Sequence, residues 1–263
     1  MSDIVHADNS GNLKKNFFPL ITVITIAYNA VSCLERTILS VVNQKYENIE
    51  YIVIDGGSID GTLDILKQYN NVIDLWISEK DAGIYDAMNK GCRKASGDFV
   101  IFMNAGDAFF LNTSLQDMIS QCPNCLNYSV IYGDVFILNS RKSDGHRISR
   151  PIKNIIDGMV SCHQSMLFKR KVMIDNPYNL ELSSDFENIL RLYKNKHQFF
   201  QVKNVIVSYF FAGGISDTQR VKNLINDLKI LIKHDLLNIK TIFKFIPKFI
   251  MAIISDVIFL CKK

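Results

Sequence analysis

Apolar runs and helical apolar spacing alternate along the first hundred residues of this chain. Four apolar runs predict strands, at 20–27, 50–55, 74–77 and 98–103. After each of the first three runs, apolar residues recur at helical intervals, as Leu34, Ile38 and Val41 do, and this predicts a helix. The alternation is typical of an α/β domain with a Rossmann-like, mostly parallel central sheet, flanking helices and right-handed crossovers.

The second half of the chain is less regular. It contains a short predicted helix from Ser114 and apolar runs that predict strands at 130–138, 165–168 and 202–211. The sequence from Ser184 to Glu187 is a capping box and predicts the start of another helix. We therefore expect a flexible tail, one α/β domain and a separate C-terminal segment, at 1–18, 19–218 and 219–263.

The C-terminal segment combines basic and apolar residues. It holds nine lysine or arginine residues against three aspartates, and its apolar run FIMAIISDVIFLC is shorter than a membrane span and contains Asp256. A basic amphipathic helical extension that lies on a membrane surface fits this pattern better than a transmembrane helix. A helix pair that packs on the domain or on a second subunit is the alternative, so a homo-oligomer stays open.

Composition narrows the classes of function. Thirty basic and 26 acidic residues give a formal net charge of +4, and no basic run is interleaved with aromatic residues, so we expect no nucleic-acid partner. The polar N-terminus lacks the apolar stretch of a secretory signal, which favours a cytoplasmic protein with reduced thiols. Cys122, Cys125, Cys162 and His163 could together suggest a zinc site, but a second CxxC spacing is missing, and small buried hydrophobes are the favoured interpretation.

Polar side chains follow the predicted strands, where an open α/β sheet has its ligand crevice. Asp55 precedes two glycines and could accept hydrogen bonds from a ribose or base. It could instead accept them from the backbone amides of the turn in which it stands. Asp81 stands directly before a helix, where helix capping and recognition of a pyrimidine imide N–H are both open. Asn104 and Asp107 end the fourth strand, where a carboxylate could hold Mg²⁺ or Mn²⁺ against a diphosphate. The chain has neither a P-loop nor a GxGxxG motif.

Six motifs taken together resemble a known enzyme family. They are TVITIAYNA, VIDGGSIDGT, SEKDAGIYDAMNKG, FMNAGD, CHQSMLF and SSDFE. Their order is similar to that of family 2 glycosyltransferases of the GT-A fold, most of all the bacterial branch that assembles surface polysaccharides and lipopolysaccharides. The resemblance covers about residues 20–215.

The family implies an inverting glycosyltransferase that moves a sugar from a nucleotide-diphosphate donor, a UDP-sugar, to a hydroxyl of a lipid-linked saccharide. Such a hexosyl- or N-acetylhexosaminyl-transferase would work at the inner face of the cytoplasmic membrane, held there peripherally by its C-terminus. For the donor, the resemblance implies that Thr25, Ala27 and Tyr28 line the nucleotide base. Asp55 would contact the nucleoside, and Asp81 the edge of a uracil-type base.

The resemblance also implies a divalent cation, although the motif departs from the family pattern. NAGD stands where the family has its DxD metal motif, with Asn104 at the first acidic position and Asp107 as its one carboxylate. His163 would contact the diphosphate or complete the metal shell, and an ordinary core or surface histidine is the alternative.

Asp185 matches the acidic position at which the family places its catalytic base. A carboxylate near a helix N-terminus stays ionised at neutral pH, as a base must be to accept the proton of the acceptor hydroxyl. Without the resemblance, stabilisation of the helix dipole would be the first interpretation of Asp185.

Two other functions stay open at this point. A nucleotidyltransferase would make the sugar nucleotide, but it needs a Gly-rich, basic loop after the first strand, and TIAYNAVSCLE has none. A non-catalytic nucleotide-binding or scaffold protein that has lost its metal site is kept open by Asn104 and Gly106 of the NAGD motif.

Overall fold

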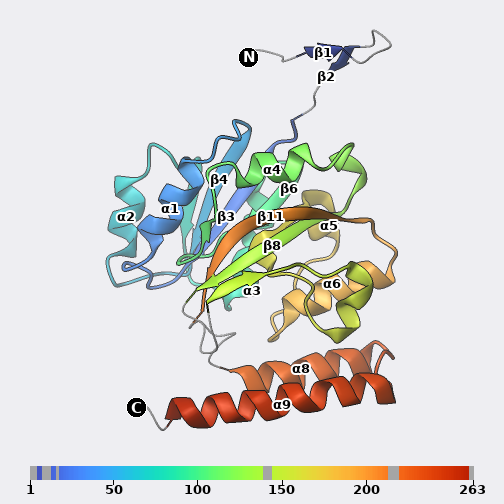
Figure 1. The fold of residues 1–263 in the computed structure, drawn as a ribbon. Helices are drawn as coiled ribbons and strands as arrows, with labels where there is room; N and C mark the ends of the chain where they lie inside the picture. Colours follow the sequence, from blue (N-terminus) through green and yellow to red (C-terminus); the bar gives the residue numbers. More distant parts are fainter. Residues whose placement is uncertain (1–4, 8–12, 16–17, 139–143, 213–218, 261–263) are drawn as a thin grey trace.

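A nine-stranded mixed sheet forms the centre of the molecule, with helices packed against it (Figure 1). The computed structural model describes residues 5–7, 13–15, 18–138, 144–212 and 219–260. The strands of the main sheet are β3 (Ile21–Ala27), β4 (Ile49–Asp55), β5 (Leu75–Ser78), β6 (Phe99–Phe102), β7 (Ala108–Phe109), β8 (Val130–Leu138), β9 (Gly145–Arg147), β10 (Met166–Lys169) and β11 (Phe199–Phe211). The α-helices are α1 (Leu34–Val42), α2 (Thr62–Gln68), α3 (Ile84–Lys94), α4 (Ser114–Ser120), α5 (Arg170–Asp175), α6 (Ser184–Lys194), α8 (Arg220–Lys233) and α9 (Ile239–Leu260).

The first half of the sheet is parallel, in the order β5, β4, β3, β6. All seven residues of β3 are buried, because helices cover both faces of the sheet. Successive side chains alternate between two cores: Val23 faces the core shared with α1, α2 and α4, whereas Ile24 faces the core shared with α3, α6 and α8. This half confirms the α/β alternation that the sequence predicts.

The second half of the sheet mixes strand directions. β10 runs antiparallel to both β6 and β8, while β11 runs parallel to β8 and antiparallel to β7. The reversal arises because the 3-10 helix η3 (His163–Ser165) lies beside β6 and β8 and leads directly into β10. β10 therefore enters the sheet at the edge where β6 ends and runs back across it.

Two short strands form at the N-terminus, in the segment for which the sequence predicts a flexible tail. β1 (Val5–Ala7) and β2 (Leu13–Lys15) pair antiparallel in a two-stranded sheet of their own, apart from the main sheet (Figure 1). The rest of residues 1–17 lies outside the described residues.

The C-terminal helices α8 and α9 lie side by side and pack on the domain (Figure 1). Two ion pairs hold them there: Lys233 with Glu187 of α6, at 2.8 Å, and Lys244 with Asp157 of the 3-10 helix η2 (Ile152–Asp157), also at 2.8 Å. Phe245 of α9 is buried, yet α9 also exposes large apolar side chains on its outer face, at Ile239, Ile242, Phe243, Ile246, Ile250, Ile253 and Ile254. Within the described part of the chain, no helix combines the length and apolarity needed to cross a bilayer.

Candidate active site

The carboxyl ends of the parallel strands meet at one edge of the sheet. The register of β3, β4 and β5 sets Ala27, Asp55 and Ser78 side by side. The chain after β6 continues along β3, because the Ala105 N–H donates to the Ile26 carbonyl at 2.9 Å. The NAGD turn therefore lies at the same edge as Asp55, as expected for the ligand crevice of an open α/β sheet.

Asp55 is fully buried, and its carboxylate accepts hydrogen bonds from the loop that follows β4. Its Oδ2 accepts hydrogen bonds from the Ser58 N–H at 2.9 Å and from the Ser78 hydroxyl at 2.6 Å, and its Oδ1 accepts from the Ser58 hydroxyl. The Gly57 N–H donates to Oδ2 as well. Asp55 thus shapes the loop after β4, and its contact with a nucleoside stays a prediction.

Asp81 and Tyr28 meet over Gly56. A Cβ atom on Gly56 would lie 2.6 Å from Asp81 Oδ2 and 3.3 Å from Tyr28 Cδ2, so only glycine allows both side chains to come this close. The Tyr28 ring is 66% exposed, and Asp81 Oδ1 accepts from the Gly83 N–H at 2.9 Å while Oδ2 faces Gly56. An exposed aromatic ring beside a carboxylate offers a stacking face and a hydrogen-bond acceptor to a planar base.

Thr25 and Ala27 lie inside the domain rather than at its surface. The Thr25 hydroxyl is buried and pairs with the Tyr51 hydroxyl at 3.1 Å. Ala27 is also buried, and its carbonyl accepts from the Gly56 N–H at 2.9 Å. The structure brings Tyr28 to the crevice but keeps the Thr25 side chain away from it.

Asp107 anchors the NAGD turn from within. Its Oδ1 accepts from the Phe211 N–H at 3.0 Å and its Oδ2 from Gln164 Nε2 at 2.6 Å. Burial raises the pKa of Asp107 to about 6, although these hydrogen bonds and the charges of His163 and Arg36 oppose the rise. Both carboxylate oxygens are therefore committed to holding β11 and η3 against the turn.

A chain of side chains leads from Asn104 to Asp185. Asn104 Nδ2 lies 3.1 Å from His163 Nε2, and His163 Nδ1 lies 3.5 Å from Asp185 Oδ2. On its other side, Asp185 Oδ1 accepts from the Tyr85 hydroxyl at 3.0 Å and from the Phe186 N–H at 3.0 Å. The structure thus joins Asn104, His163 and Asp185, which are far apart in the sequence.

These neighbours decide the charge of Asp185. Burial acts to raise its pKa, but the hydrogen bond and charge of His163, the Tyr85 hydroxyl and the Phe186 N–H together leave the pKa of Asp185 below its ordinary value. The carboxylate is ionised at neutral pH, and its side chain is still 23% exposed. An ionised, partly accessible carboxylate at this edge can accept a proton from a bound hydroxyl group.

Comparison with known proteins identifies the family. Residues 22–176 match the sequence model of Glycosyl transferase family 2. The chain belongs to this family. An uncharacterized glycosyltransferase of Mycobacterium tuberculosis is 34% identical over 183 residues, which cover 66% of this chain and 68% of that protein.

Solved structures of glycosyltransferases share the GT-A fold of this family 2 member. TarS residues 1–349 of S. aureus, in complex with UDP, align with a TM-score of 0.63 at 18% identity, over 84% of this chain and 68% of that one. The mannosyltransferase PcManGT from Pyrobaculum calidifontis, in complex with GDP-Man and Mn²⁺, aligns with a TM-score of 0.62 at 15% identity, over 92% of this chain and 76% of that one.

The residues of the NAGD turn fit a metal ion only in part. Each Asp107 carboxylate oxygen already accepts one hydrogen bond, whereas Asn104 Oδ1 is buried without a hydrogen-bond partner and could serve as a ligand. Gly106 adopts a φ of 105°, a conformation in which an aspartate would be strained. Among the described residues, no three His, Cys, Asp or Glu side chains gather into a metal site.

Sequence reasoning missed three contributors to this site. Tyr85 stands inside the quoted motif SEKDAGIYDAMNKG, and Gln164 inside CHQSMLF, but neither receives a role from the pattern. Arg36 donates to the Gly106 carbonyl at 2.6 Å, and its guanidinium lies 3.7 Å from the centre of the Phe211 ring. No motif signals Arg36, because its partner lies 70 residues away along the chain.

Cys122 and Cys125 are both buried free thiols of the core shared with α1, α2 and α4. Burial raises the pKa of Cys122 to about 12, so its thiol is protonated at neutral pH. They pack as small hydrophobes, as the favoured interpretation of the sequence has it.

Proposed function

We propose that this glycosyltransferase is an inverting enzyme in which Asp185 is the catalytic base. The observation that supports this is the Asp185 carboxylate itself, which is held by Tyr85 and His163, ionised, and accessible at the ligand edge of the sheet. The acceptor hydroxyl oxygen attacks the anomeric carbon from the face opposite the diphosphate. The bond from that carbon to the diphosphate oxygen breaks, the nucleoside diphosphate leaves, and the hydroxyl proton passes to Asp185.

The proposed donor is a UDP-sugar. The structures of TarS with UDP and of PcManGT with GDP-Man support a nucleotide-diphosphate sugar as the class of donor. In this chain, Tyr28 and Asp81 would receive the base over Gly56, with Asp81 Oδ2 accepting the imide N–H of uracil. Guanine presents the same kind of N–H donor, so the choice of uracil rests on the resemblance and needs the donor screen described below.

A divalent cation, Mn²⁺ or Mg²⁺, is proposed as a partner of the donor diphosphate. Support comes from the Mn²⁺ in the PcManGT complex and from the unpartnered Asn104 Oδ1. When bound, such a cation neutralises charge on the leaving diphosphate and needs only one or two protein ligands. Asp107 would share its carboxylate oxygens between the cation and the hydrogen bonds from Gln164 and the Phe211 N–H, and its role as a ligand stays a prediction.

The proposed acceptor is a lipid-linked saccharide at the inner face of the cytoplasmic membrane. The exposed apolar side chains of α9 support peripheral attachment to a bilayer. A second subunit is the other partner that this face could bind, and the vesicle experiment in the Discussion separates the two.

A donor screen with full-length protein tests the proposed reaction. Release of UDP from a panel of UDP-sugars should be at least about a hundredfold slower in Asp185→Asn than in the wild type, because a general base contributes that much to the rate. Affinity for UDP should change little, since Asp185 does not contact the proposed base site. Asp64→Asn, at an exposed carboxylate of α2, is the matched control and should behave as the wild type.

The same measurements separate the enzyme from a non-catalytic nucleotide-binding protein, which is the second candidate. The hydrogen bonds that both Asp107 carboxylate oxygens accept within the protein, and the glycine at position 106, are the observations in its favour. UDP binding without turnover of any donor would support the second candidate. Turnover at the wild-type rate in Asp185→Asn would remove Asp185 from the mechanism. Calorimetric titration with UDP, with and without Mn²⁺, tests the cation: tighter binding with Mn²⁺ is expected.

A further inference from the structure

Glu187 of α6 is a buried carboxylate that does not cap its own helix. The sequence from Ser184 to Glu187 predicts a capping box, yet no side-chain hydrogen bond caps the N-terminus of α6, and the buried Ser184 hydroxyl finds no partner among the described residues. Only 4% of Glu187 is exposed, and it lies two residues after Asp185. A buried carboxylate is costly unless other groups bind it, so the partners of Glu187 indicate its role.

Three side chains from two other segments bind the Glu187 carboxylate. Its Oε1 lies 2.8 Å from Lys233 Nζ and 3.3 Å from His234 Nε2, at the C-terminal end of α8. Its Oε2 accepts a hydrogen bond from Asn179 Nδ2, in the loop between α5 and α6. Burial acts to raise the pKa of Glu187, but these three partners leave it below its ordinary value, so the carboxylate is ionised at neutral pH.

The same end of α8 also holds the other end of α6. Lys194 Nζ, in the last turn of α6, donates to the His234 carbonyl at 2.8 Å. Between these two polar contacts, Leu231 of α8 and Leu190 of α6 are buried in one apolar core. Contacts at the first and the last turn fix both the position and the direction of α6 relative to α8.

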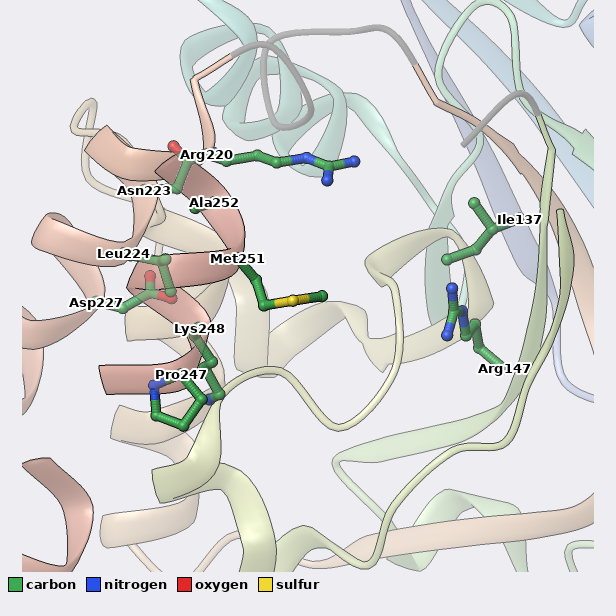
Figure 2. A pocket seen from close by; sticks show the side chains of 10 residues that line it. All are labelled: Ile137, Arg147, Arg220, Asn223, Leu224, Asp227, Pro247, Lys248, Met251 and Ala252. Atoms are coloured by element: carbon green, nitrogen blue, oxygen red, sulfur yellow. The ribbon is translucent and has the colours of Figure 1, made fainter. Parts of the chain in front are cut away.

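A cavity separates the N-terminal half of α8 from part of the sheet. Arg220 and Leu224 of α8 border this cavity of about 550 Å³, and Ile137 of β8 and Arg147 of β9 lie on its opposite wall (Figure 2). Elements on two sides of a cavity lack the close contacts that hold packed elements in place. The contacts at the C-terminal end of α8 therefore gain weight in fixing this helix to the domain.

The loop before α6 extends the connection toward the proposed base. Asn179 stands in this loop, and the preceding residue, Tyr178, is fixed to α3 by two hydrogen bonds with Asn89, at 2.8 and 3.0 Å. The Tyr178 ring lies 5.4 Å from the Tyr85 ring, centre to centre, and the Tyr85 hydroxyl donates to Asp185. One set of contacts thus runs from α8 through this loop to the hydroxyl that holds the base.

These contacts matter more for position than for stability. Lys233 is 64% exposed, and ion pairs of exposed lysines contribute little to the free energy of folding. The Glu187 carboxylate is buried, however, and must keep its partners or move toward water. That movement would carry the first turn of α6 with it, and displacement of a reacting group by about 1 Å can lower a rate about a hundredfold.

We propose that Glu187 is a positioning residue for transfer: its bonds to α8 set the position of the first turn of α6, and with it that of Asp185. Glu187 acts through Asp185 and does not contact the substrate. This assignment rests on the proposed function, because it needs Asp185 to be the base. It adds α8 to the machinery of transfer, although α8 lies beyond residues 22–176, which match the family.

Kinetics of UDP release by the full chain test the proposal, with the UDP-sugar that the wild type turns over fastest as the donor. In Glu187→Gln, kcat per UDP-binding site, counted by calorimetry, should fall about tenfold or more, because a displacement of less than about 1 Å already misaligns a general base. KM for the donor should stay as in the wild type, since the proposed base site lies around Gly56 and not on α6. A residue that only stabilises the fold would lower the number of binding sites and leave kcat per site unchanged.

Substitutions of the partner and of the base show whether Glu187 acts through them. Lys233→Met should lower kcat, whereas Lys233→Arg keeps a positive charge beside Glu187 and should retain most of the rate. In Asp185→Asn, adding Glu187→Gln should cost no further rate, because the base that Glu187 positions is already absent. Lys229→Met removes an exposed lysine one turn earlier on α8, and as the matched control it should show the wild-type rate.

The outcomes separate this proposal from the proposed function. The positioning role is overturned if kcat per binding site in Glu187→Gln equals that of the wild type, if KM rises instead, or if the effects of Glu187→Gln and Asp185→Asn multiply. Equal losses in Lys233→Arg and Lys233→Met would also overturn it. Wild-type turnover in Asp185→Asn, or turnover of no donor by the wild type, would instead overturn the proposed function.

Discussion

Gly56 shows how much of this site depends on the absence of a side chain. Its backbone lies between the Tyr28 ring and the Asp81 carboxylate, and the missing Cβ leaves the space in which the two come together. Gly56 is not among the residues with positive φ, so its importance lies in close approach rather than in backbone conformation.

Gly56→Ala should therefore weaken UDP binding with little loss of stability. The new Cβ would lie 2.6 Å from Asp81 Oδ2, and the partly exposed Asp81 side chain can move away at small cost to folding. We expect roughly a tenfold loss of UDP affinity, as for the loss of a single hydrogen bond of about 1.4 kcal/mol. Calorimetry and thermal melting measure the two effects, and unchanged affinity would exclude Asp81 and Tyr28 as the base site.

Tyr85→Phe should reveal a positioning role through its pH profile. The Tyr85 hydroxyl donates to Asp185 Oδ1 and helps to hold the pKa of Asp185 low, so its removal raises that pKa. The base works when deprotonated, and the acidic limb of the kcat profile should therefore move to higher pH, with KM for the donor little changed. A loss of rate that is uniform from pH 5 to 8 would mean that Tyr85 has only a structural role.

At this scale the sequence predicts residue types better than their contacts. Asp81, Asn104, Asp107, His163 and Asp185 all stand in recognisable motifs and all reach the edge of the sheet. Whether a given side-chain oxygen accepts a hydrogen bond within the protein depends on partners distant in sequence, such as the Phe211 N–H for Asp107. No local sequence pattern contains that information. For the same reason, the sequence could not predict that the Asp107 carboxylate accepts hydrogen bonds from Gln164 and the Phe211 N–H.

Elements with strong periodicity are predicted closely, and short ones are missed. The strand expected at 20–27 is found as β3 at Ile21–Ala27, and the one expected at 50–55 as β4 at Ile49–Asp55. β7 has two residues and β9 three, which is too few for an alternation of apolar and polar positions to be visible. The antiparallel direction of β10 depends on where η3 lies, which is a tertiary property.

The helix α8 carries a half-buried carboxyl group, that of Asp227, whose titration should be measurable. Burial and the charge of Asp185 raise the pKa of Asp227 to about 6, while Ser183 and the charge of Lys248 oppose the rise. In the unfolded chain an aspartate titrates near about 3.9. Between these two values the native state binds more protons, so the free energy of unfolding falls as pH rises through this window.

Asp227→Asn should remove that pH dependence. The stability of the variant relative to the wild type should increase between about pH 4 and pH 7, by about 2–3 kcal/mol, since two pKa units correspond to that amount. Thermal melting of both proteins across this range measures the difference. A constant difference at all pH values would contradict the assignment of this titration to Asp227.

At the scale of the whole molecule, the described part of α9 presents an exposed apolar face, and the sequence leaves its partner open between a membrane and a subunit. The triple substitution Phe243→Ser, Ile246→Ser and Ile250→Ser should lower the binding of the full chain to phosphatidylglycerol-containing vesicles by about a hundredfold or more, because each side chain loses its apolar burial in the bilayer. Flotation measures the bound fraction. Ile59→Ser, at an isoleucine that is 92% exposed in the loop before α2, is the control.

Equal flotation of the triple variant and the wild type would exclude α9 as the membrane contact. Analytical ultracentrifugation would then test the alternative. A dimer in the wild type that dissociates in the variant would assign the same face to a second copy of the chain.

The ion pairs of α8 and α9 with the domain have a consequence for what the enzyme can build. Glu187 lies two residues after Asp185 on α6 and pairs with Lys233, and Lys244 of α9 pairs with Asp157 of η2, so these ion pairs connect the two C-terminal helices to the part of the domain that carries the proposed base. A protein seated on a bilayer through the outer face of α9 would hold Asp185 at a constant height above the lipid. Only acceptor hydroxyls at that height could react, and each added sugar would move the new chain end out of reach. The molecule would then act as a ruler that adds its sugar at one position of a growing glycan and stops.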